Sequence, residues 1–103
     1  MEVEKNITEN YLIGKAKATT TGESGKEIEV SLSFRWDEIG QEWDEISGTA
    51  KTTDEREAVA QFSRNARNAD NKLHFVFADV ESMADFAKAI AEVIKETGES
   101  LKA

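Results

Sequence analysis

The chain has 103 residues, of which 39% are hydrophobic and 33% charged, and its formal net charge at pH 7 is −8. This length and composition are typical of a single folded domain spanning residues 1–103, and they exclude a disordered chain. No apolar run is long enough to cross a membrane, and the N-terminus is too polar for a signal peptide, so we expect a cytoplasmic protein. The absence of cysteine excludes a disulfide and a thiolate metal site.

The excess of acidic residues indicates which partners the surface attracts. There are 21 Asp and Glu residues against 13 Lys and Arg residues. Such a surface repels nucleic acid and anionic membranes, and it is attracted to basic protein surfaces. We therefore expect a basic protein partner, without direct contact to nucleic acid or membrane.

The first half of the chain has the period-two pattern of β-strands. Residues 1–10 either cap an edge of the fold or form a loosely ordered N-terminal segment. Tyr11–Thr20 reads as a strand with small residues on one side, and residues 22–26 read as a turn. Ile28–Trp36 alternates large apolar with polar residues, which is typical of an antiparallel strand with one core face. The alternation resumes at Ile46–Thr52.

Matching the apolar residues of the last two strands predicts their register. Phe34 lies opposite Ile46 in this register. The same register pairs opposite charges on the other face, namely Arg35 with Glu45 and Glu29 with Lys51. In this register Trp36 faces the core and Trp43 lies on the opposite face.

The second half of the chain predicts two helices with a strand between them. Asp54 and Glu57 form a capping box, and residues 55–67 follow at helical spacing. Residues 72–79 are apolar on both sides, which predicts a buried strand, and an amphipathic helix follows with Gly98 at its C′ position. The order β-β-β-α-β-α predicts an α+β fold, with a mainly antiparallel sheet of about four strands and two helices.

No group of residues has the spacing of a catalytic or metal site. His74 is the only histidine, and it lies in mid-strand without a second histidine or a nucleophile motif. The carboxylates around the turn at residue 40 lack the spacing of an EF-hand loop. We therefore predict no catalytic residue, no metal and no cofactor. Arg64, Arg67 and Lys72 form the one local positive excess, which we interpret as a solvated helix end.

The acidic turn with its tryptophan has the composition of an interface. In the predicted register, one face at this end of the sheet collects aromatic, aliphatic and arginine side chains and is rimmed by carboxylates. The predicted partner-binding residues are Trp43, Asp37, Glu38, Glu42, Asp44, Glu45, Tyr11, Ile13 and Arg35.

Three hypotheses for function follow. The first is a non-catalytic acidic binding module that docks on a basic protein surface. If that surface normally holds nucleic acid, the module acts as an inhibitor by charge mimicry, as small viral or accessory proteins do. The second is a small-ligand binder or minor enzyme with a pocket near His74, beneath Gly14, Ala16, Gly48 and Ala50. The third is a homodimer formed through the free face of the sheet.

Overall fold

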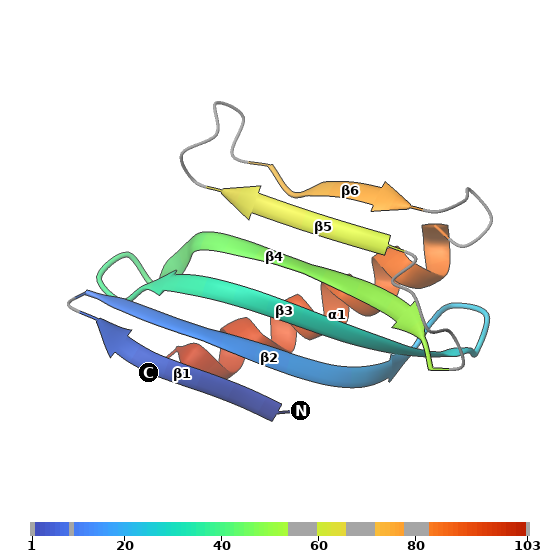
Figure 1. The fold of residues 1–103 in the computed structure, drawn as a ribbon, viewed down its shortest axis with the longest axis horizontal. Helices are drawn as coiled ribbons and strands as arrows, with labels where there is room; N and C mark the ends of the chain where they lie inside the picture. Colours follow the sequence, from blue (N-terminus) through green and yellow to red (C-terminus); the bar gives the residue numbers. More distant parts are fainter. Residues whose placement is uncertain (1, 9, 54–59, 66–71, 78–82, 103) are drawn as a thin grey trace.

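A computed structural model describes residues 2–8, 10–53, 60–65, 72–77 and 83–102, in which six strands form one antiparallel sheet and one helix lies across it (Figure 1). The strands follow their order in the sequence: β1 (Glu2–Thr8), β2 (Tyr11–Thr21), β3 (Glu27–Asp37), β4 (Glu42–Thr52), β5 (Ala60–Asn65) and β6 (His74–Phe77). The helix is α1 (Met83–Leu101). The predicted α+β fold with an antiparallel sheet is confirmed, whereas the described chain has six strands and one helix in place of about four and two.

The central hairpin has the predicted register. Phe34 lies opposite Ile46, and the predicted charge pairs also lie opposite one another: Arg35 with Glu45 and Glu29 with Lys51. The alternating residues of β3 that face the helix are all buried: Ile28, Val30, Leu32, Phe34 and Trp36. Because a shift of one residue would expose this whole set, its burial holds the register.

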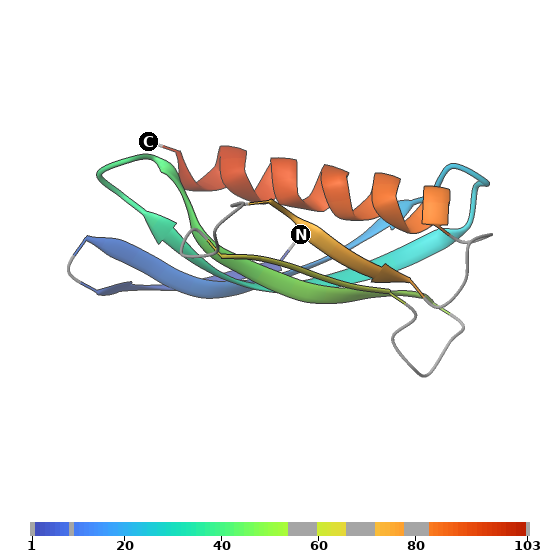
Figure 2. The ribbon, with the colours of Figure 1, turned by 90° about the horizontal axis from the view of Figure 1, so that it is seen from above.

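The core lies between the sheet and α1, which covers one face of it (Figure 2). The helix packs over β2, β3 and β4. Its buried residues recur at helical spacing: Phe86, Ala89, Ile90, Val93, Thr97, Gly98 and Leu101. No other helix or strand covers the opposite face within the part of the chain that the structure describes. We call that face the open face.

Polar contacts hold the N-terminal half of α1 against the β2–β3 turn. Asp85, in the first turn of the helix, accepts hydrogen bonds from the backbone N–H of Ser24 at 2.6 Å and from its hydroxyl at 2.7 Å. Further along the helix, the Thr20 hydroxyl donates to a carboxylate oxygen of Glu92 at 2.8 Å. The carboxylate of Asp85 therefore joins the helix to a turn that lies 61 residues earlier in the chain.

The helix predicted for residues 55–67 is wrong for its central part, because residues 60–65 form β5. Ala60 and Phe62 are buried, whereas Gln61 and Ser63 are exposed, so a period of two describes this stretch. A β-carbon placed on Gly48 of β4 would lie only 2.7 Å from the ring of Phe62 in β5. Phe62 therefore packs directly against this glycine. The remainder of that prediction, at residues 54–59 and 66–71, lies outside the described residues.

At the N-terminus, where the sequence left two alternatives open, residues 2–8 form β1, which pairs with β2 over its full length. Two further predictions are corrected. The helix does not end before Gly98 but continues to Leu101, which is buried in the core. The predicted buried strand is the outermost strand β6, in which Phe75 is 36% and Val76 66% exposed. The helix packs over β2–β4, which leaves these side chains uncovered.

The contact of Asp85 with Ser24 predicts an acid-dependent stability. The backbone N–H and then the hydroxyl of Ser24 hold the pKa of the Asp85 carboxyl below its ordinary value of 3.8, and the charge of Lys26 adds to the effect. A carboxyl with a lower pKa in the folded chain stabilises the fold while it is ionised. This contribution is present above about pH 4 and is lost as the pH falls through the folded-state pKa.

Asp85→Asn should therefore lower the free energy of unfolding at neutral pH and flatten its decline below pH 4. The measurement is urea denaturation at a series of pH values, with Glu96→Gln, exposed on the same helix, as control. Parallel curves for the wild type and Asp85→Asn would show that this carboxylate does not join the helix to the turn.

Candidate partner-binding surface

The turn between β3 and β4 is ordered by its own side chains. One carboxylate oxygen of Asp37 accepts the backbone N–H groups of Ile39 at 2.9 Å and of Gly40 at 3.1 Å. Gln41 takes a left-handed φ of 54° and donates its amide to the carbonyl oxygen of Glu38 at 2.7 Å. These bonds fix the turn so that the side chain of Ile39 stands 75% exposed at its tip.

A β-bulge changes the predicted position of Trp43. The register shifts between Arg35 and Trp36, so that Trp36 lies opposite Trp43 and Asp44 is the extra residue of β4. Trp43 thus lies on the helix side. Its ring meets that of Trp36 edge to face at a centroid distance of 5.0 Å, and it lies 3.6 Å from the β-carbon position of Gly98 in α1. The prediction that Trp43 lies on the open face is therefore wrong.

Four of the other predicted residues, Tyr11, Ile13, Arg35 and Asp44, lie together at this end of the open face. The guanidinium carbon of Arg35 lies 5.6 Å from the ring centre of Tyr11, and its Nη1 lies 3.3 Å from an oxygen of Asp44. Ile13 lies opposite Arg35 in the sheet and is 39% exposed. The bulge brings Asp44 to Arg35, so this carboxylate is already paired within the chain.

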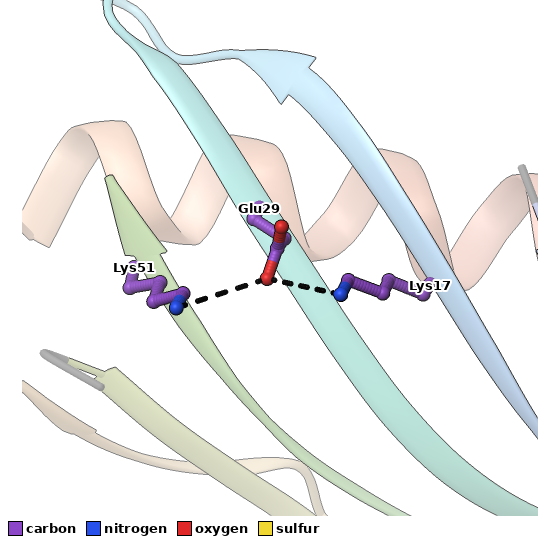
Figure 3. A network of polar contacts seen from close by, with 3 residues as sticks. All are labelled: Lys17, Glu29 and Lys51. Atoms are coloured by element: carbon purple, nitrogen blue, oxygen red, sulfur yellow. Dashed lines mark ion pairs between the residues drawn. The ribbon is translucent and has the colours of Figure 1, made fainter. Parts of the chain in front are cut away.

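In the central part of the open face, one glutamate lies between two lysines. One carboxylate oxygen of Glu29 lies 3.5 Å from the ammonium of Lys17 and 4.0 Å from that of Lys51, so a single acid bridges three strands (Figure 3). Five carboxylates lie within the nine residues 37–45. The acidic character is therefore concentrated at the β3–β4 turn, where Glu38 and Glu42 flank the exposed Ile39.

Ile39 is a residue that the sequence reasoning missed. The sequence predicts a turn at its neighbour Gly40, and the predicted partner-binding residues do not include Ile39. An apolar residue beside the glycine of a predicted hairpin turn cannot reach either face of the sheet, and that signal was present in the sequence.

The surroundings of His74 do not form an enclosed site. His74 is exposed on the open face, opposite Ser63, and it lines a shallow depression with Thr49 and Val76. Ala16 and Ala50, which were expected to roof a pocket, are buried in the core on the helix side. Among the described residues, no group of three or more His, Asp or Glu side chains is placed to hold a metal ion.

Comparison of the chain with known protein families, with curated proteins and with solved structures finds no match. Within the described residues, no helix has the length and apolar character needed to cross a membrane.

The position of Trp43 predicts a structural role for its side chain. Trp43→Ala should lower the free energy of unfolding by about 2 kcal/mol or more, because truncating a packed aromatic residue leaves a cavity between the β3–β4 hairpin and α1. Urea denaturation measures the loss, with Ile39→Ala as a matched control that should change stability by less than about 0.5 kcal/mol. Equal, small effects of the two substitutions would place Trp43 away from the helix.

Proposed function

We propose that this protein is a non-catalytic binding module that docks the β3–β4 turn on a basic protein surface. The observation that supports this most strongly is the 75% exposed Ile39, held at the tip of a turn ordered by Asp37 and flanked by Glu38 and Glu42. This replaces Trp43 with Ile39 as the apolar anchor of the interface. Arg35, Tyr11 and Ile13 lie at the neighbouring end of the open face and form its border.

The turn combines the two features that efficient docking requires. An apolar side chain that enters a pocket of the partner supplies affinity, because its burial removes apolar surface from water. The surrounding carboxylates accelerate the encounter with a basic surface and select against acidic partners. Because the turn is already ordered by Asp37 and Gln41, little conformational entropy is lost when it binds.

Not all five carboxylates of the turn contribute equally. Asp37 accepts the turn N–H groups and Asp44 pairs with Arg35, so both have partners within the chain. Glu45 also interacts within the chain. Glu38 accepts one long hydrogen bond from the Gln41 amide, at 3.5 Å, and Glu42 is exposed, so these two carboxylates carry most of the charge that a basic partner meets. If the partner normally grips nucleic acid, occupation of its basic surface by this turn inhibits it by competition.

The test is affinity capture on immobilised wild-type protein and on variants, at low and at high salt, with quantitative identification of retained proteins. We expect basic proteins that are retained by the wild type at low salt and are lost with Ile39→Ser. The isolated complex should be weakened about 30-fold by this substitution, as expected for a hot spot worth about 2 kcal/mol. Glu38→Gln with Glu42→Gln should slow association and flatten its dependence on salt.

Two matched controls separate the turn from the rest of the surface. Met83→Ser alters another exposed apolar side chain, which is 46% exposed at the first residue of α1. Glu23→Gln with Glu27→Gln removes the same number of charges as the turn variant, from exposed positions at the β2–β3 end of the sheet. A loss in this charge control equal to that in Glu38→Gln with Glu42→Gln would mean that binding reflects net charge alone. Retention of the same basic proteins by Ile39→Ser would contradict the proposal.

A further inference from the structure

Strand β6 is a sheet edge with exposed apolar side chains on both faces. In the described part of the chain its one neighbour is β5. Phe75 and Phe77 lie on the helix side with their rings stacked at a centroid distance of 5.5 Å and an angle of 8°, and Val76, on the open face, is 66% exposed. An apolar edge of this kind is a template for pairing with another strand.

The two edges of the sheet differ in their chemistry. β1 carries two glutamates and a lysine within EVEKNIT, and charged residues are a common means of preventing edge-to-edge pairing. β6 has the sequence HFVF, without Lys, Arg, Asp, Glu or Pro. Its shortness limits the strength of pairing but does not block it.

The charges near β6 permit a second copy of this acidic chain to approach. Residues 60–82 contain three basic residues, Arg64, Arg67 and Lys72, and three acidic ones, Asp70, Asp79 and Glu81, so this part of the sequence has no net charge, whereas the whole chain carries −8. At physiological ionic strength, charges more than about 8 Å apart are largely screened, so the local composition decides the encounter. Two copies therefore meet at this edge with less repulsion than through the acidic β3–β4 turn.

We propose that two copies of the chain pair antiparallel through β6, about a two-fold axis at Val76. In this register the three residues Phe75, Val76 and Phe77 meet only apolar residues of the second copy. On the helix side, Phe75 lies opposite Phe77 of the second copy, and Val76 lies opposite its own copy on the open face. The two sheets join edge to edge, which is distinct from association through the open face.

The small size of the edge predicts a weak dimer. A stable interface buries about 800 Å² on each partner, and the pairing of two four-residue strands covers less than that. Backbone hydrogen bonds and the aromatic contacts supply the affinity. The dissociation constant of the dimer should therefore lie in the range of transient complexes.

Sedimentation velocity over a range of concentrations tests the pairing through Val76→Lys and Val76→Glu. Each variant alone should raise the dissociation constant about tenfold or more, because two like charges meet at the axis. An equimolar mixture of the two variants should dimerise again, because opposite charges then face each other. Thr19→Lys, exposed on β2 far from the edge, is the matched control and should dimerise like the wild type.

Circular dichroism and thermal melting of each variant check that it is folded. A wild type that stays monomeric up to about 1 mM would overturn the proposal, because this concentration is well above the dissociation constants of standard-sized interfaces. A dimer that persists in Val76→Lys would place the interface elsewhere, for instance on the open face. Failure of the mixture to recover would contradict the two-fold register. A monomer that instead binds an unrelated extended peptide at β6 would also exclude the second copy as the occupant.

Discussion

One extra residue in β4, opposite Arg35, decides which side chains of the β3–β4 hairpin face the helix. Without the bulge, the register set by Phe34 and Ile46 would place Trp43 on the open face. With it, Trp43 closes the end of the core, where it contacts Phe34 and Trp36 edge to face and lies against Gly98. The contact of Trp43 with Gly98 also holds the C-terminal end of α1 on the sheet, since the buried Leu101 follows Gly98 by less than one helical turn. The extra residue, Asp44, reaches Arg35 on the other face.

A single helix over a six-stranded sheet leaves surfaces of different kinds. The middle strands β2–β4 are covered on one side, and their open face is mainly polar, with Glu29 between Lys17 and Lys51 at its centre. At one end the acidic turn projects Ile39, and at the outer edge β6 keeps apolar side chains in contact with water. Both proposed interfaces therefore lie where the helix does not reach. They are independent, because one depends on carboxylates around an aliphatic tip and the other on an uncharged strand.

The periodicity of the sequence is sufficient to predict the elements that have one apolar and one polar face. The alternation in Ile28–Trp36 predicts β3 and its register with β4, and the apolar stripe of Phe86 and Ile90 predicts α1. A bulge leaves only a shift of phase in the alternation, here the three-residue spacing between Trp43 and Ile46, and a single residue beyond the shift reads equally well as a side chain on the other face. The stretch at residues 60–65 fits both the helical and the strand period around Phe62. It forms a strand because it pairs with the edge of β4, and this tertiary constraint is not contained in the local sequence. The proposed site therefore stays at the predicted turn, but its proposed apolar anchor changes from Trp43 to Ile39.

The position of Trp43 can be measured directly by nuclear Overhauser spectroscopy on the labelled protein. The bulge predicts cross-peaks between the indole protons of Trp43 and the α-protons of Gly98, because the ring lies against this turn of the helix. It also predicts contacts between the indoles of Trp43 and Trp36, whose ring centres are 5.0 Å apart. Cross-peaks from Trp43 to Tyr11 and Ile13, with none to Gly98, would place the tryptophan on the open face and contradict the bulged register.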